Sequence, residues 1–327
     1  MSAVAEIRDL VVSYASDGKT TYALDGVSLI VEAGDAIGIV GESGSGKSTL
    51  GMAIGKLLAP NATFEQGEVF VSGHSVLRCE PSELRSLRRD RLGFVFQNPM
   101  AALDPTMRVG RQIELALGKR ASQAEIGVLL GRAGLADPAA VAASFPHELS
   151  GGMAQRVVIA LSIARGPAIV VADEPTASLD ASIKVVILEL LLALGRETGC
   201  GLLVMTHDLK MAALRCERIV VMYAGRVVEA GRSSEVFAAP RHPYTQALVR
   251  AAAGNEGSGG RLEPIPGVPP LLRERSRNCA FAPRCPFVQP LCRSERPPEI
   301  AVEGRSVACH FAASGLVPAR DLRESVS

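Results

Sequence analysis

The chain has 327 residues, of which 47% are hydrophobic and 21% charged, so its composition is that of a globular protein and its length allows two domains. Its 35 Lys and Arg balance 34 Asp and Glu, which excludes the net positive charge typical of nucleic-acid-binding proteins. No apolar run approaches the ~18 residues that a membrane span needs, and Glu6, Arg8 and Asp9 stand where a secretion signal would need apolar residues. We therefore expect a cytosolic protein whose contact with a membrane comes through a partner.

Short apolar segments of strand-like composition recur along the chain, and several alternate with helical patterns such as residues 48–58. This alternation predicts an α/β fold with a parallel sheet covered by helices, and a closing hairpin around Ala224 and Gly225 makes the sheet mixed. The strand-like segments are residues 4–14, 22–32, 36–40, 67–73, 169–172, 202–205, 219–223 and 226–229.

The composition changes at three points along the chain. Residues 98–145 are rich in Ala and Leu, and we expect them to form a helical subdomain inserted into a core made of residues 1–97 and 146–235. Residues 254–260 are predicted to be a flexible linker. They lie in a small C-terminal extension, residues 236–327, that is rich in Pro, Arg and Cys.

A glycine-rich segment, residues 41–49, fits the pattern G-x-x-x-x-G-K-[ST] between a predicted strand and a predicted helix. The glycines let backbone N–H groups converge on phosphate oxygens, and the helix N-terminus adds a favourable dipole. Lys47 is expected to reach the β- and γ-phosphates, and the Ser48 hydroxyl to ligate Mg²⁺. The alternative is a glycine-rich turn that only caps a helix. The predicted phosphate-binding residues are Gly41, Ser43, Gly44, Ser45, Gly46, Lys47, Ser48 and Thr49.

Two further apolar runs end in polar residues that suit phosphate chemistry: one ends at Asp173 and Glu174, and the other runs into His207. A carboxylate at the end of a buried strand needs compensation, which Mg²⁺ held by Asp173 would supply. Glu174 is then suited to polarise a water for attack on the γ-phosphate. Because ligands of α/β sheets bind beyond the carboxyl ends of the strands, we expect these residues to meet the glycine-rich loop, with His207 sensing the γ-phosphate. The alternatives are a solvated acidic pair and a surface histidine.

Residues 149–156 fit L-S-G-G-x-x-x-R, in which Ser150, Gly151 and Gly152 open a helix and offer N–H groups, a hydroxyl and a dipole to an anion. With this motif the chain resembles the ATPase subunits of ABC transporters, over about residues 4–250. The resemblance implies a P-loop NTPase core, with ATP and Mg²⁺ as cofactors. It also implies that this motif contacts the γ-phosphate of ATP held by a second ATPase subunit. The bland alternative is an ordinary capped helix.

The resemblance implies further roles. Tyr14 would stack on adenine, although a strand tyrosine packed in the core is the alternative. Gln97 would contact Mg²⁺ and link the helical subdomain to a membrane subunit, and Asp180, in the segment 178–180, would lie where two ATPases meet. His207 would be the switch histidine. The implied catalytic residues are Glu174, His207 and Gln97, and the implied Mg²⁺ ligands are Ser48, Gln97 and Asp173.

Residues 96–105, 242–248 and 265–270 resemble the oligopeptide, dipeptide and nickel importer branch of this family. That branch implies a related sister ATPase, two permease subunits and an extracytoplasmic solute-binding protein, with the ATPases at the cytoplasmic face of the membrane. We expect an ATP-hydrolysing subunit of a peptide importer. The alternatives are nickel or another small solute, a soluble ABC ATPase of DNA repair or translation, and a redox protein with a bound nucleotide.

Four of the seven cysteines fall in the C-terminal extension, at Cys279, Cys285, Cys292 and Cys309, with 5, 6 and 16 residues between them. These spacings match neither a C-x₂-C zinc pair nor a bacterial ferredoxin. The segment is too short to form a core of its own, which favours a metal as a staple. Members of the resembled branch carry similar tails, and some bind a [4Fe–4S] cluster there, which we expect here. Zinc, with His310 as a further ligand, and free thiols are the alternatives.

Overall fold

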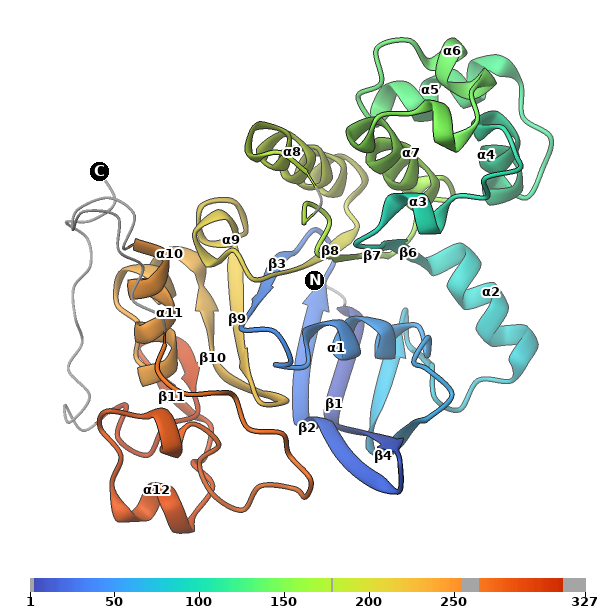
Figure 1. Ribbon diagram of the computed structural model, residues 1–327. Coiled ribbons are helices and arrows are strands. Elements are labelled where there is room, and N and C mark those ends of the chain that lie inside the picture. The colour runs from blue at the N-terminus through green and yellow to red at the C-terminus, as the bar shows by residue number, and fades with distance from the viewer. Residues whose placement is uncertain (1–2, 178, 254–264, 314–327) are drawn as a thin grey trace. The chain divides into compact units, whose positions relative to one another are not determined.

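The computed structural model describes residues 3–177, 179–253 and 265–313 (Figure 1). The chain divides into two compact units. The first unit comprises Met1–Glu6, Ile30–Ala36 and Phe70–Met205, and the second comprises Ile7–Leu29, Ile37–Val69 and Thr206–Ser327. The division predicted from the sequence into core, helical subdomain and extension stays a prediction, and the predicted linker at 254–260 lies outside the described residues. Within the described ranges, no helix has both the length and the apolar character needed to cross a bilayer.

The first unit contains a short parallel sheet in the order β8-β7-β6. In this sheet Leu92 pairs with Ile169, and Ile169 with Gly201. The first four residues of β7 and all of β8 are buried, as expected for parallel strands covered on both faces. The strands are β6 (Leu92–Val95), β7 (Ile169–Asp173) and β8 (Gly201–Thr206), and β5 (His74–Ser75) forms a separate short hairpin with the end of β4.

The helices of the first unit include the Ala- and Leu-rich segment that the sequence predicts to be helical (Figure 1, green). Helix α7 lies against strand β6, where a Cβ atom at Gly93 would stand only 2.4 Å from the carbonyl oxygen of Ser162. Glycine is therefore required for this close approach. The helices are α2 (Pro81–Arg91), α3 (Pro99–Ala102), α4 (Val109–Leu117), α5 (Gln123–Arg132), α6 (Pro138–Ala143), the 3-10 turn η1 (Pro146–Glu148), α7 (Gly151–Ile163) and α8 (Ala181–Thr198).

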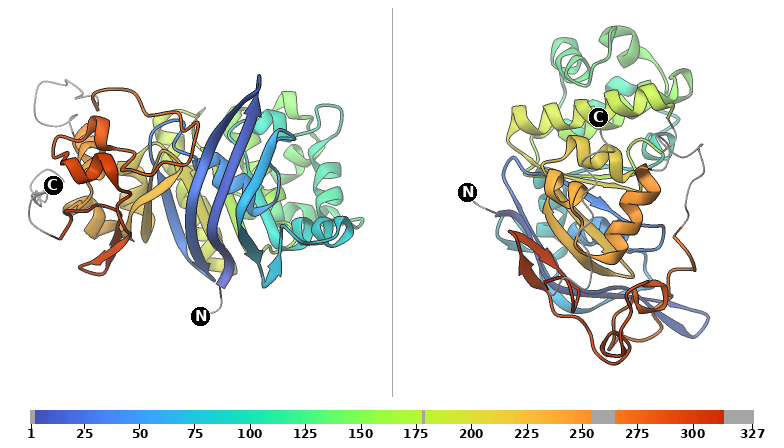
Figure 2. Two further views of the ribbon diagram at one scale, coloured as in Figure 1. Left: turned by 90° about the horizontal axis from the view of Figure 1, so that it is seen from below. Right: turned by 90° about the vertical axis from the view of Figure 1, so that its left-hand side faces the viewer.

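The second unit contains strands of two sheets. One has the order β2-β1-β4, seen as long blue strands in Figure 2. The other has the order β11-β12-β10-β9-β3, in which β3 and β9 are parallel and the remaining pairs antiparallel, so the predicted mixed sheet is confirmed. The strands are β1 (Ala3–Ser16), β2 (Lys19–Glu32), β3 (Ala36–Val40), β4 (Ala62–Val71), β9 (Arg218–Tyr223), β10 (Arg226–Arg232), β11 (Ile300–Val302) and β12 (Arg305–Val307).

The C-terminal residues of the second unit pack into its core. Val307 of β12 pairs with Glu229 of β10, so the extension adds two strands to a sheet that begins with β3. Phe281 is 2% exposed and lies in one apolar cluster with Tyr223 and Tyr244. The helices are α1 (Lys47–Ile54), α9 (Leu209–Arg215), α10 (Ser233–Ala238), α11 (Pro243–Ala253), the 3-10 turn η2 (Ala282–Arg284) and α12 (Pro290–Ser294).

Candidate nucleotide-binding site

The predicted phosphate loop joins β3 to α1 in the second unit. Helix α1 begins at Lys47, and its N-cap, Gly46, has a left-handed backbone with φ 102°. A Cβ atom at Gly46 would stand 2.5 Å from the carbonyl oxygen of Ala23, and one at Gly41 would stand 2.2 Å from that of Met222. Both positions therefore require glycine, because the backbone of neighbouring strands lies directly against the loop.

The side chain of Lys47 folds back across this loop. Its ammonium donates to the carbonyl oxygens of Gly41, at 2.7 Å, and Glu42, at 3.1 Å, although the residue is only 7% exposed. The loop is also tied to the β9–β10 turn, where the N–H of Gly225 donates to the carbonyl oxygen of Ser45 at 3.0 Å. A buried cation at the N-terminus of a helix favours an anion there. The exposed residues of the loop and of the first turn of α1 are Ser43, Gly44 and Ser48.

Two other predicted site residues lie in the second unit. The hydroxyl of Tyr14 is 3.4 Å from that of Thr49, so this tyrosine of β1 stands beside the first turn of α1. His207 is exposed in the connection from β8 to α9. Asp208 fixes the start of α9, because its carboxylate accepts the N–H of Met211 at 2.9 Å.

The acidic pair lies in the first unit, at the end of β7. Asp173 is the last residue of the strand and pairs with Met205 of β8. The N–H of Glu174 donates to the carbonyl oxygen of Met205 at 2.9 Å, and Glu174 has φ 46°. A left-handed backbone at a residue other than glycine is unfavourable and is concentrated at functional sites. Both side chains are half-buried at the carboxyl edge of the sheet.

The remaining predicted residues of the first unit stand at helix starts or beyond strand ends. Gln97 is exposed, two residues beyond the end of β6, at the same edge of the sheet as Asp173. Ser150 caps α7, since its hydroxyl accepts the N–H of Met153 at 3.3 Å. Asp180 is the residue before α8 and is exposed, and Ser178, in the same predicted segment, lies outside the described residues.

The predicted site residues therefore form two sets. The second unit holds the phosphate loop, Tyr14 and His207, and the first unit holds Gln97, Asp173, Glu174, Asp180 and the motif at 150–152. Most of these residues lie at the ends of strands, in the loops that follow them or at the starts of helices, whereas Tyr14 lies within strand β1. That the two sets complete one site stays a prediction.

The four cysteines of the extension line one small pocket in the second unit, together with His242 and His310. The N–H of Cys279 donates to the carbonyl oxygen of Cys292 at 3.0 Å. Burial raises the pKa of Cys279, Cys285 and Cys309, that of Cys285 to about 11. Nevertheless, no three His, Cys, Asp or Glu side chains in the described ranges are grouped so that they could hold a metal ion. The predictions that these cysteines bind a metal and that they hold an iron–sulfur cluster are therefore not supported by this structure.

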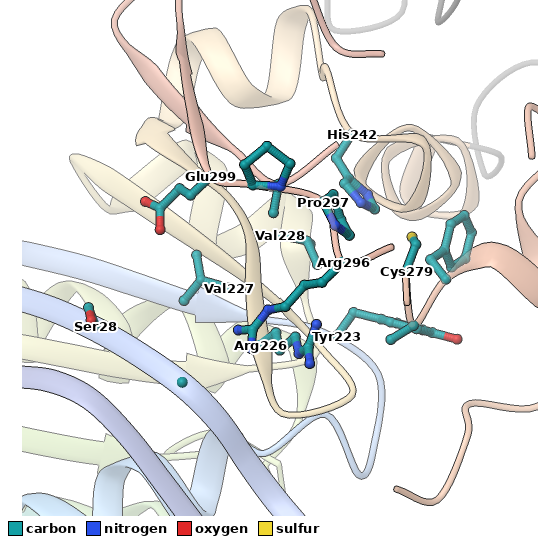
Figure 3. Close-up of a pocket in the computed structure, with 15 residues that line it drawn as sticks. Ser28, Tyr223, Arg226, Val227, Val228, His242, Cys279, Arg296, Pro297 and Glu299 are labelled. Carbon is teal, nitrogen blue, oxygen red and sulfur yellow. The ribbon is translucent and has the colours of Figure 1, made fainter. Parts of the chain in front are cut away.

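A second pocket, of about 250 Å³, lies beside the first, and Cys279 and His242 line both (Figure 3). Its arginines have partners. Arg226 donates to the carboxylate of Asp25 at 3.0 Å, and Arg296 donates to the backbone carbonyl oxygen of Asp25 at 3.0 Å. The positive charge of Arg226 is thus offset by the buried carboxylate of Asp25, and Arg296 lies 3.8 Å from the same carboxylate.

No local sequence pattern predicts one contact of the phosphate loop. The carboxylate of Glu42 accepts two hydrogen bonds from Arg284, and the backbone N–H of Glu42 donates to the hydroxyl of Tyr244. The only signal in the sequence is that Tyr244 lies in the importer-like segment 242–248 and Arg284 in the cysteine-rich tail, and neither says anything about Glu42.

The sequence matches two family models: "ABC transporter" over residues 24–177, and "Oligopeptide/dipeptide transporter, C-terminal region" over residues 228–292. It is 40% identical to the probable peptide ABC transporter ATP-binding protein y4tR of Sinorhizobium fredii, over 93% of each chain. It is 39% identical to the dipeptide transport ATP-binding protein DppD of Escherichia coli, over 94% of this chain and 97% of that one.

Solved structures agree with this. The ATP-binding cassette MJ0796, solved as a dimer in a post-hydrolysis state bound to ADP and Pi, is 32% identical and superposes with a TM-score of 0.63. The match covers 70% of this chain and 98% of that one.

Proposed function

Because the chain belongs to the ABC transporter family of ATP-binding subunits, we propose that it binds ATP at residues 41–49 and hydrolyses it to drive the import of peptides. The observation that carries the proposal is the loop between β3 and α1, where Gly46 and Gly41 admit no side chain and Lys47 is held inside. When ATP binds, the Lys47 ammonium exchanges its two carbonyl partners for phosphate oxygens, and the loop N–H groups stabilise the charge.

Mg²⁺ fits the residues proposed to hold it, because each offers the hard oxygen ligand that this ion prefers. Ser48 is exposed at the first turn of α1, and Asp173 and Gln97 lie at one edge of the first unit's sheet. The ion, when bound, would neutralise charge on the phosphates.

Glu174 is the proposed general base. It takes a proton from a water whose oxygen attacks the γ-phosphorus, and ADP leaves with the β–γ bridging oxygen. Its left-handed φ of 46° supports this role, because unfavourable backbone conformations of this kind are concentrated at functional sites. His207, on the connection after β8, is proposed to sense the γ-phosphate, and Tyr14 to contact the adenine.

The test compares three variants of the full chain. Glu174→Gln should bind MgATP and lose at least about 100-fold in turnover, because a general base contributes about 10²–10⁴. Lys47→Ala should lose binding. Glu189→Gln, an exposed glutamate on α8, is the control and should match the wild type. Turnover that survives in Glu174→Gln contradicts the base, and binding that survives in Lys47→Ala contradicts the loop.

We further propose that residues 150–152 complete the ATP site of a second ATPase, a related sister chain. A Cβ atom would meet nothing nearer than 3.8 Å at Gly151 and 3.5 Å at Gly152, so packing within this chain does not require either glycine. Glycine lowers the stability of a helix, so two glycines that packing does not require need another reason. The close approach of a phosphate from outside the chain would supply that reason. The exposed Asp180 is proposed to lie at the same interface. Ser150→Arg should keep ATP binding in the loop and lose turnover, and unaltered turnover would contradict this role.

The relatives that are named for peptide and dipeptide transport support peptides as the solute, with nickel or another small solute as the alternative. We propose that Gln97 and residues 98–145 transmit the movement caused by ATP binding and hydrolysis to one of two permease subunits at the cytoplasmic face of the membrane. We also propose that an extracytoplasmic protein delivers the solute. Reconstitution with the permeases tests this: ATP-dependent uptake of labelled dipeptide supports it, and uptake of Ni²⁺ alone contradicts it.

We also propose a [4Fe–4S] cluster on Cys279, Cys285, Cys292 and Cys309, supported by their convergence on one pocket. Cysteine thiolates are the usual ligands of iron–sulfur clusters, and these four would hold the cluster. Anaerobically purified protein should be brown and contain iron and labile sulfide. Cys285→Ser should lose them, whereas Cys79→Ser, outside the extension, should retain them. Stoichiometric zinc, or no metal, would contradict the cluster.

A further inference from the structure

The C-terminal extension contacts the phosphate loop at Glu42, the residue after Gly41. The guanidinium of Arg284 donates to both carboxylate oxygens of Glu42, at 2.7 and 3.0 Å, and the Arg284 side chain is only 3% exposed. The N–H of Glu42 donates to the hydroxyl of Tyr244 at 2.8 Å. Both the side chain and the backbone of this loop residue are thus held by residues more than 200 positions away in the sequence.

Arg284 is itself held in place. Its Nε donates to the carbonyl oxygen of Pro266 at 2.7 Å, and its other nitrogens donate to the carbonyl oxygen of Ile265 at 3.1 Å and the hydroxyl of Tyr223 at 3.3 Å. The segment that carries it is anchored by Phe281, whose ring stands edge-on to that of Tyr223 at 5.2 Å. Figure 3 shows Tyr223 on the wall of the pocket that Cys279 and His242 also line. The guanidinium is therefore presented to the loop in a fixed orientation.

Glu42 would oppose a polyphosphate if its charge were not compensated. It lies in the loop proposed to hold the phosphates, and its carbonyl oxygen already accepts from the Lys47 ammonium at 3.1 Å. A carboxylate there repels phosphate oxygens and competes for the positive charge of the loop. A bidentate guanidinium neutralises the carboxylate and fixes its position at the same time.

We propose that Arg284 is a positioning residue for nucleotide binding: by pairing with Glu42 it neutralises the carboxylate and holds the phosphate loop in the form that accepts ATP. This rests on the proposed function of residues 41–49. The C-terminal extension is thereby an integral part of the ATP site.

The experiment measures the affinity of the full chain for a non-hydrolysable ATP analogue with Mg²⁺. Arg284→Gln should weaken binding about tenfold, which is about 1.4 kcal/mol. Arg284→Lys should recover part of the loss, because it restores the charge without the bidentate geometry. Arg241→Gln is the control, since Arg241 forms its ion pair in the extension with Glu303. It should bind within about twofold of the wild type.

A double-mutant cycle separates this role from a general loss of structure. In a Glu42→Gln background, Arg284→Gln should cause no further loss, because no carboxylate is left to neutralise. An affinity of Arg284→Gln within twofold of the wild type overturns the proposal, and so does an equal loss in both backgrounds. If Lys47→Ala still binds the analogue, the phosphate site itself is wrong, whatever Arg284 does.

Discussion

Asp25 is the buried centre of an ion group in the second unit, and its replacement should destabilise that unit strongly. Its side chain is fully buried in β2 and accepts hydrogen bonds from Arg226, at 3.0 Å to Nε, and from Arg275 at 2.9 Å. Arg226 is also nearly buried, with 9% of its side chain exposed, and donates to the carbonyl oxygen of Ser276 at 2.6 Å. Asp25→Asn keeps the shape and removes the only charge that these contacts place against Arg226.

The magnitude follows from the burial of the two partners. Removing one partner of a buried pair costs about 3–5 kcal/mol, because the other charge is left in the interior without compensation. Arg275 is 41% exposed, so water solvates it and its own contribution is at most about 1 kcal/mol. We expect Asp25→Asn to lower the free energy of unfolding by about 3 kcal/mol or more, and Arg275→Gln by less than about 1 kcal/mol.

Urea unfolding of both variants at pH 7.5, followed by far-UV circular dichroism, measures these differences. Both variants alter the same ion group. Asp25→Asn leaves the buried charge of Arg226 without a partner, whereas Arg275→Gln removes a charge that is exposed to solvent. Asp25→Asn within 1 kcal/mol of the wild type would refute the reasoning, as would an equal cost for Arg275→Gln.

The same ion group sets a dependence on pH. Burial raises the pKa of Asp25, but the hydrogen bonds from Arg226 and Arg275 and the charges of Arg226 and Arg296 outweigh burial and bring the pKa below 3.8. A carboxyl with a depressed pKa in the folded state contributes stability above its unfolded pKa and loses it as pH falls through the folded value. The stability difference between the wild type and Asp25→Asn should therefore be constant from pH 7.5 to about 5 and shrink below 3.8. A difference that grows as the pH falls below 3.8 would contradict the charge as its cause.

Three further predictions concern the second unit. Gly46→Ala should lose nucleotide binding at least tenfold, because a Cβ atom would stand 2.5 Å from the carbonyl oxygen of Ala23, and calorimetric titration with MgATP checks this. Phe281→Ala should cost about 3–5 kcal/mol, since the ring is 2% exposed among other aromatic rings, and a lower urea midpoint measures it. Cys216, whose pKa burial raises to about 12, should react with iodoacetamide at pH 8 only in denaturant, as mass spectrometry would show. Wild-type affinity of Gly46→Ala would contradict the first prediction, and an unchanged urea midpoint of Phe281→Ala the second. Rapid alkylation of Cys216 in the native protein would contradict the third.

The sequence predicts well those parts of the structure that depend on interactions between neighbouring residues. The loop at 41–49 and the capped start of α7 at Ser150 depend on a few neighbouring residues, so their patterns suffice to place them. The carboxyl ends of β7 and β8 follow from short apolar runs, whereas β6 is not among the strands predicted from the sequence. The helix expected at 48–58 ends earlier, at Ile54, because Gly55 follows as its C-cap.

The amino-acid sequence by itself predicts which segment would bind phosphate, since a glycine-rich turn before a helix owes its shape to local backbone sterics. Only the tertiary structure decides that Arg284 pairs with Glu42, that β12 joins β10, and that four cysteines share a pocket. Those contacts join residues that are far apart in the chain, and their formation depends on the packing of the whole core around Phe281 and Tyr244. The spacing of residues along the chain does not predict these contacts, because the neighbours of a residue in space depend on how the whole unit buries its apolar side chains.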